Sequence, residues 1–389
     1  MIKYYSIPAD FSKNTIDSLA LLNSKYSTSQ VIETYGNITV DNIFGSGRSC
    51  CQLPGLDIDS LKKYVEYSRN KGIEFNYTFN ASFVQNQEFT KKGVYKIKEF
   101  IYKIHKTGIK SLTIALPQLI ELVNSMQLGF KIKASAISSI DNVNKALAYK
   151  WLNVDKIVIC ELINRDFHEL RNIREAFGEK VELIVNTPCY KDCSYRMPHY
   201  NQISCDSVNV TNDVSFTYFE HKCMIRRYSD IANWMKINFI RPEDIKLYEK
   251  IGIQHFKLQG RQAILKDGDI VRTVEAYFQE NFDGNLIDLI NLFSKLNPFH
   301  VNIDNKKLEG FIEPFFKNQS FCKHNCNKCN YCRNFILKNL DVESIQTVCD
   351  MAQQYYQNVK TYADFISEVN VSDAQRISVN NIDAEDFKF

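Results

Sequence analysis

The chain contains twelve cysteines, the residues most able to bind a metal or react, and eight of them fall into two groups. The first group follows an apolar run at residues 181–187 and comprises Cys189, Cys193, Cys205 and Cys223. The second group packs Cys322, Cys326, Cys329 and Cys332 into one short segment. In a chain without signs of secretion, clustered thiols favour a metal site over a disulfide framework. Each group therefore predicts a metal site.

The spacing of the second group favours an iron–sulfur cluster over zinc. Its thiols are separated by three, two and two residues, so thiolates can turn inward on one cubane cluster. Zinc stays the alternative, although four-cysteine zinc sites usually split into two pairs roughly a dozen residues apart. The embedded C-x-x-x-C-x-x-C does not indicate a radical-SAM enzyme. That signature follows the first strand of its barrel, whereas this one follows the last predicted strand.

Composition and charge narrow the classes of protein that this chain can belong to. The chain has 389 residues, of which 44% are hydrophobic and 24% charged, as is typical of a protein with a sizeable buried core. A net charge of +3 is too small to indicate nucleic-acid binding by itself. The N-terminus lacks a signal-peptide pattern, and no apolar run approaches the ~18 residues of a membrane span. We therefore expect a cytoplasmic protein without a membrane span.

Short apolar runs alternate with amphipathic stretches along most of the chain. Parallel strands that are buried on both faces have this appearance, so the pattern predicts an α/β protein with a (β/α)8 barrel. A doubly wound open sheet is the alternative, but no GxGxxG or Walker loop follows any strand. The predicted strands are residues 2–7, 30–35, 73–80, 111–116, 130–136, 156–160, 181–187 and 255–258. Helices are predicted between them, among others at 60–71, 94–107, 118–126, 141–149, 166–177 and 242–251.

The barrel is expected to span residues 1–297, with a cysteine-bearing insertion at about 188–241. An extension at 298–389 carries the second cysteine group and a terminal helix at 342–365. Functional groups of such barrels lie at the carboxyl ends of the strands, which places Cys189 at the barrel mouth. Cys50 and Cys51, after the second strand, face the same mouth. Cys160 and Cys349 fit buried core positions.

Polar residues behind two strands are candidates for binding a substrate. Arg165 and Asp166 follow the sixth strand and Arg261 follows the eighth, and guanidinium groups suit a carboxylate or phosphate. The alternative is structural, with a helix-start pair for the first two and a salt bridge for Arg261. Arg196 and His199 lie within the first cysteine group and are candidate donors to cluster sulfides or to substrate. A surface position is the alternative for His199.

Five segments carry a resemblance to a known family. They are residues 72–80, 164–170, 186–193 with Arg196 and His199 behind them, 240–244 and 256–261. Together they resemble the collagenase-like peptidase family U32, and the second cysteine run resembles an extension seen in one branch of that family. The resemblance implies a TIM-like barrel and, as in several members, an oxygen-sensitive [4Fe-4S] cluster. Its candidate ligands are the four cysteines of the first group, with Cys50 or Cys51 as an alternative to Cys223.

The resemblance also bears on activity. Despite the family name, it implies oxygen-independent hydroxylation of RNA bases or of quinone precursors, and the chain has no GxSxG, HExxH or paired-carboxylate motif. We therefore expect an iron–sulfur enzyme of redox or hydroxylation type with two [4Fe-4S] clusters, or with Zn²⁺ at the C-terminal site. The alternatives are a U32-type peptidase and a non-catalytic electron-transfer scaffold. The substrate class stays open among a small molecule, a peptide and an RNA base, and the expected partners are an electron-donor protein or a U32 partner subunit.

Overall fold

The computed structural model describes residues 1–208, 217–296, 298–356 and 361–362. Eight parallel strands close into a barrel in chain order, with β8 pairing to both β7 and β1. All eight predicted strands are present, so the predicted (β/α)8 barrel is confirmed. The strands are β1 Lys3–Pro8, β2 Ser29–Gly36, β3 Glu74–Phe79, β4 Ser111–Ile114, β5 Lys131–Ala134, β6 Lys156–Val158, β7 Val181–Ile184 and β8 His255–Lys257.

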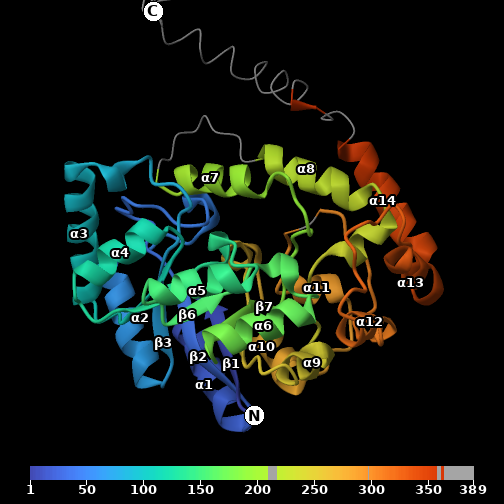
Figure 1. The fold of residues 1–389 in the computed structure, drawn as a ribbon, viewed down its shortest axis with the longest axis horizontal. Coiled ribbons are helices and arrows are strands. Elements are labelled where there is room, and N and C mark those ends of the chain that lie inside the picture. The colour runs from blue at the N-terminus through green and yellow to red at the C-terminus, as the bar shows by residue number, and fades with distance from the viewer. Residues whose placement is uncertain (209–216, 297, 357–360, 363–389) are drawn as a thin grey trace, which may run out of the picture.

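An outer ring of helices covers the barrel (Figure 1). Side-chain caps begin several of them: Asp57 accepts from the Ser60 amide, and Asp166 accepts from the Glu169 amide. The helices of the ring are α1 Lys13–Lys25, α2 Ile58–Asn70, α3 Lys91–Lys106, α4 Pro117–Ser125, α5 Val143–Trp151, α6 Phe167–Phe177, α9 Ile245–Glu249, α10 Ile270–Gln279 and α11 Leu286–Ile290. None of the helices in the described ranges is long and apolar enough to cross a membrane.

The insertion after β7 contains two helices, α7 Arg196–Asp206 and α8 Thr217–Tyr228. Figure 1 shows them lying across the end of the barrel opposite the N-terminus. No helix was predicted from the sequence in this insertion, so α7 and α8 were missed. The buried residues of α7 include Arg196, Ser204 and Asp206, so the helix has no continuous apolar stripe to detect.

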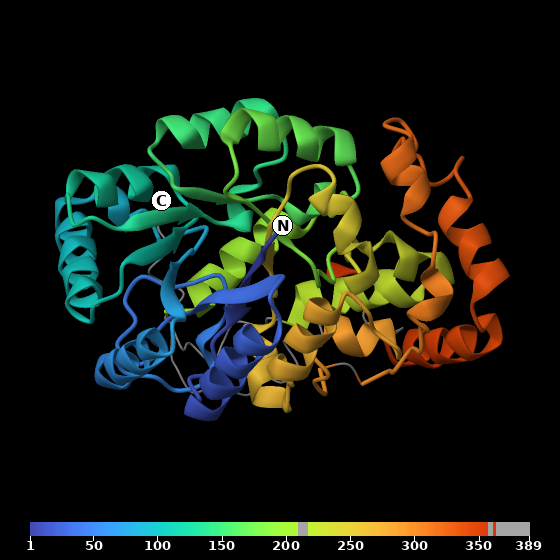
Figure 2. The ribbon, with the colours of Figure 1, turned by 90° about the horizontal axis from the view of Figure 1, so that it is seen from below.

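The C-terminal extension packs against one side of the barrel (Figures 1 and 2). It contains α12 Glu313–Lys317, α13 Tyr331–Asn339 and α14 Val342–Tyr356. Helix α14 contacts α8, and α13 contacts the 3-10 segment η5 (Ile231–Lys236). Ile336, Ile345 and Cys349 belong to the same apolar cluster as the barrel core. The predicted terminal helix is observed as far as Tyr356, and residues 357–360 and 363–365 of that prediction lie outside the described residues.

A buried ion network fills the barrel interior. Lys133 on β5 lies 2.9 Å from a Glu182 oxygen on β7 and forms an ion pair with Glu33 on β2. Lys156 on β6 adds a longer contact to Glu182, at 3.5 Å. Burial alone would raise the pKa of Glu33, but the charges of Lys133 and Lys156 outweigh it and lower that pKa to about 2. Lys133 and Lys156 together therefore neutralise two carboxylates that the barrel would otherwise bury without a partner.

Replacing this lysine should destabilise the barrel strongly. Lys133→Met leaves Glu33 and Glu182 buried without their main counter-charge, so we expect a loss of about 3–5 kcal/mol in the free energy of unfolding. Urea denaturation measures the loss. Lys131→Met, at an exposed position of the same strand, is the matched control, with an expected change below about 0.5 kcal/mol. Equal stabilities of the two variants would contradict the role given to Lys133.

Candidate functional site

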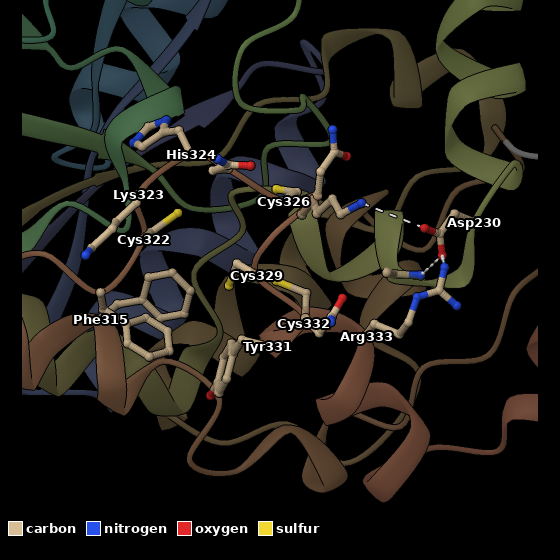
Figure 3. Close-up of a pocket in the computed structure, with 16 residues that line it drawn as sticks. Asp230, Phe315, Cys322, Lys323, His324, Cys326, Cys329, Tyr331, Cys332 and Arg333 are labelled. Carbon is tan, nitrogen blue, oxygen red and sulfur yellow. Dashed lines mark hydrogen bonds and ion pairs between the residues drawn. The ribbon is translucent and has the colours of Figure 1, made fainter.

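The four cysteines of the second group line one pocket of about 240 Å³ (Figure 3). Cys322, Cys326 and Cys329 are exposed on the loop before α13, and Cys332 lies half-buried in the first turn of that helix. Burial raises the pKa of Cys332 to about 11, with further contributions from the charges of the other three thiols. The four sulfur atoms are thus electrostatic neighbours.

Across the described ranges, no three His, Cys, Asp or Glu side chains converge as a metal-binding group. The second cysteine group nevertheless fits a four-thiolate site by its donor set, because all four thiols border one pocket.

Arg165 lies beneath this extension and not at the barrel mouth. Its Nη1 donates to the Met235 carbonyl at 2.6 Å, its Nη2 donates to the Ile237 carbonyl, and its guanidinium stacks 4.9 Å from the ring centroid of Phe311. Burial lowers the pKa of Arg165, while the neighbouring Cys332 and Cys322 act in the opposite direction.

Arg165 and Asp166 line a second pocket, of about 310 Å³, together with Cys322, Cys326 and Cys332. The structure therefore separates Arg165 from Arg261, which was expected to face the same space. The chain after β6 forms a short 3-10 turn, Glu161–Ile163, and then leads into the outer helix α6, which directs Arg165 away from the barrel axis. Asp166 caps that helix, as the structural alternative predicted.

At the barrel mouth, the structure brings Cys189 and Cys223 close together. Arg227 on α8 donates to the Pro188 carbonyl at 3.0 Å and approaches the Cys223 sulfur at 3.8 Å. Burial raises the pKa of Cys189 to about 12, and Glu161 and Cys223 raise it further. Two of the four predicted thiol ligands are therefore near enough behind β7 to affect each other electrostatically.

The other two cysteines of the first group lie apart from this pair. Cys193 precedes α7, and Cys205 lies at its C-terminal end beside Asp206. The Cys50 thiol donates to the Asp206 carbonyl at 3.3 Å, so this end of α7 adjoins the loop after β2. That Cys193 and Cys205 are the other two ligands of a cluster at the mouth stays a prediction.

Arg196 and His199 occupy the first half of α7. Arg196 forms a buried ion pair with Glu161 at 3.1 Å and donates to the Ser139 hydroxyl at 2.5 Å. The His199 ring stacks on Phe219 at 5.3 Å between centroids, and burial lowers its pKa to about 4. Arg196 thus stabilises the mouth, and His199 is a neutral imidazole near neutral pH.

Arg261 lines a cavity of about 60 Å³ at the centre of the mouth. Its Nη1 donates to the Thr78 hydroxyl at 2.8 Å and to the Asn37 side-chain oxygen. Arg48 and Lys257 line the same cavity, and the charge of Arg48 also acts on the Cys189 thiol. Cys189 itself is not among the described residues that line the cavity.

Sequence reasoning missed Lys257 and Arg48 as mouth residues. Lys257 stands within the segment 256–261 that carries the family resemblance, yet its position in a predicted strand suggested only barrel structure. One signal in the sequence could have identified Lys257: it is a lysine in a strand that should be buried on both faces. A buried lysine needs a partner for its charge inside the protein.

The fold and these loops define a class of (β/α)8 protein whose functional groups follow the carboxyl ends of the strands. The model of Peptidase family U32 matches residues 50–325. An uncharacterized protease of Methanocaldococcus jannaschii, MJ1657, is 30% identical over 344 residues, which cover 87% of this chain and 98% of the relative. The chain belongs to peptidase family U32.

Two solved structures are also similar to this chain. The U32 peptidase Mk0906 is 14% identical, with a TM-score of 0.49 over 67% of this chain and 93% of that one. A D-psicose 3-epimerase solved in the presence of D-fructose is 12% identical, with a TM-score of 0.32 over 54% of this chain and 82% of that one.

The contacts of Arg165 predict how the extension is held. Arg165→Lys keeps the charge but loses the two-pronged donation to Met235 and Ile237 and the ring stacking, so we expect a loss of about 2–3 kcal/mol in unfolding free energy. Urea denaturation gives the loss, and limited proteolysis should show earlier cleavage in the extension. Arg171→Lys, on the helix α6 that follows Arg165, should change the stability by less than about 0.5 kcal/mol. Unchanged stability and cleavage in Arg165→Lys would contradict this assignment.

Proposed function

We propose that this U32 protein is an iron–sulfur enzyme that carries out oxygen-independent redox or hydroxylation chemistry at its barrel mouth. The observation that carries the proposal is the set of four thiols around one pocket, Cys322, Cys326, Cys329 and Cys332. Four cysteine ligands at such short intervals are typical of a [4Fe-4S] cluster. Zn²⁺ is the alternative occupant of this pocket.

The barrel mouth is the proposed place of the reaction. Cys189 and Cys223 would hold a second cluster there with Cys193 and Cys205, or with Cys50 or Cys51 in place of Cys223. Such a cluster would carry electrons between the substrate and a redox partner. Around it, Arg196 and Glu161 keep the base of α7 fixed, and Arg261 offers a positive charge to an entering substrate. The C-terminal cluster would relay electrons from a donor protein or stabilise the extension.

A peptidase is the second candidate function, since the relative from Methanocaldococcus jannaschii is named an uncharacterized protease. A cysteine peptidase requires a thiolate activated by a nearby base. Here burial raises the pKa of Cys189 to about 12 and lowers that of His199 to about 4, which is opposite to what an activated thiolate–imidazolium pair requires. These two shifts disfavour a cysteine peptidase that uses Cys189 with His199.

Metal analysis tests the proposal directly. Protein purified without oxygen should contain about eight iron atoms and eight sulfides per chain, from two cubane clusters. Cys326→Ser should reduce both contents by about half, because the C-terminal site loses one ligand. Cys349→Ala is the control, since Cys349 is a buried core residue that belongs to neither cysteine group, and the iron content of this variant should equal that of the wild type. Two zinc ions and no sulfide would refute the iron–sulfur proposal.

Peptide degradation separates the two functions. The iron–sulfur proposal predicts no peptide cleavage by protein prepared in air, because the clusters are lost there. Cleavage that persists both in air and in Cys189→Ala would favour the peptidase. A screen of small molecules and RNA bases with a reduced electron donor under anaerobic conditions would then identify the substrate, and stable donor binding without any turnover would favour the electron-transfer scaffold.

A further inference from the structure

The cavity at the centre of the barrel mouth is lined by positively charged side chains and, among the described residues, by no carboxylate. Arg48, Lys257 and Arg261 supply three basic groups, and Thr78, Asn80 and Ser135 add neutral hydrogen-bonding side chains. None of the described residues that line it is Asp or Glu. Its volume of about 60 Å³ exceeds the roughly 10–15 Å³ that one water needs and suits the head group of a small oxyanion.

Lys257 is the residue that most requires a partner here. Its side chain is buried, with the residue 7% exposed, and its Nζ has no hydrogen-bond partner. The ring of Tyr35 lies 3.4 Å from that Nζ and provides a cation–π contact, but a ring face does not replace the hydrogen bonds of an ammonium group. A buried amine without acceptors carries a desolvation cost that a bound anion would offset.

The strand register explains why the interior carboxylates do not serve Lys257. Glu182 is paired with His255 across β7 and β8, whereas Lys257 is paired with Ile184, two residues nearer the mouth. Glu182 and Glu33 are both contacted by Lys133. Lys257 therefore lies one layer above an ion network that is already complete.

The two arginines of the cavity are held by neutral groups. Arg48 donates to the Gln262 side-chain oxygen at 2.9 Å and to the Gly47 carbonyl at 2.8 Å. Arg261 donates to Asn37 and Thr78. By contrast, the buried Arg196 and Arg241 each form an ion pair with a carboxylate, Glu161 and Asp244 respectively. The neutral partners position the guanidinium groups of the cavity without cancelling their charge.

We propose that this cavity is an anion-binding subsite in which Lys257, Arg261 and Arg48 hold a carboxylate or phosphate group of the substrate. Charge-assisted hydrogen bonds from a lysine and two arginines suit either oxyanion. Calling the anion part of the substrate rests on the proposed function. The binding itself depends only on the barrel, so it occurs whether or not the cysteine groups hold clusters.

Binding should be coupled to protonation of Lys257. Burial lowers the pKa of Lys257 to about 7, as do Lys133 and Arg261, while Glu182 and Glu33 act in the opposite direction and Tyr35 covers the amine with its ring. A bound anion favours the charged amine and so raises this pKa. Protons are then taken up on binding, and affinity is highest below pH 7 and falls as pH rises above it.

Calorimetric titration of the full chain with sulfate, phosphate and acetate at fixed ionic strength tests the proposal. We expect one saturable site, with sulfate affinity about tenfold weaker at pH 8.5 than at pH 6.5 because sulfate itself does not titrate in this range. Preference for sulfate and phosphate over acetate would identify a phosphate-type group, and the reverse preference a carboxylate. Proton uptake is measured by repeating the titration in buffers of different ionisation enthalpy.

Two variants and a control give the test its specificity. Lys257→Met and Arg48→Met should each weaken sulfate binding at pH 6.5 by at least about tenfold. Lys266→Met removes an exposed lysine near the same mouth and should leave binding unchanged. Lys257→Met should also fold well, because methionine suits a buried position, and circular dichroism checks this.

The outcomes separate this proposal from the proposed function. Absence of saturable binding for all three anions, or equal binding by wild type and Lys257→Met, would overturn the anion subsite. Iron content is measured on the same samples. Binding by protein without iron or sulfide would support the subsite while refuting the iron–sulfur enzyme, and iron-loaded protein without binding would do the reverse.

Discussion

The need to neutralise charge inside a closed barrel governs this molecule. Parallel strands packed under helices leave no water to solvate an inward-facing carboxylate, yet β2 and β7 each place one inside. Lys133 and Lys156 meet that need with the two carboxylates Glu33 and Glu182. These four side chains pair with one another within a single layer of the barrel interior. The carboxylates are therefore not available to the next layer, at the carboxyl ends of the strands. There Arg48, Lys257 and Arg261 give the cavity of the mouth an excess of positive charge.

The two cysteine regions are connected through a short stretch of chain after α8. Cys223 lies on α8, which contacts both η5 and α14. Segment η5 in turn contacts α13, the helix whose first turn holds Cys332. Arg165 fixes the same stretch by binding the carbonyls of Met235 and Ile237. The extension and the mouth thus share one structural support, although more than 100 residues separate Cys223 from Cys332 along the sequence.

The barrel could be predicted because its strands are continuous apolar runs at regular intervals, and burial on both faces forces that composition. Helix α7 could not, because its buried residues include Arg196, Ser204 and Asp206, so it lacks the apolar periodicity of a core helix. The position of Arg165 was also not predicted. Chain order shows that Arg165 follows the sixth strand, but it does not show the direction in which the 3-10 turn before Arg165 leads the chain. The role of Lys257 was missed because the residue lies within a predicted strand. Its role depends on which layer of the barrel it occupies, and only the register between β7 and β8 reveals that.

The apolar core runs unbroken from the barrel strands to Ile345 and Cys349 of α14. Elements that share one core lose their packing together, so the barrel and the extension should behave as a single cooperative unit and not as a domain with a detachable appendage. In evolutionary terms, a relative without the extension needs a different, more polar surface at Phe239, which now packs against Phe311 of the extension. The extension and the barrel wall beneath it must then change together, as two faces of one interface.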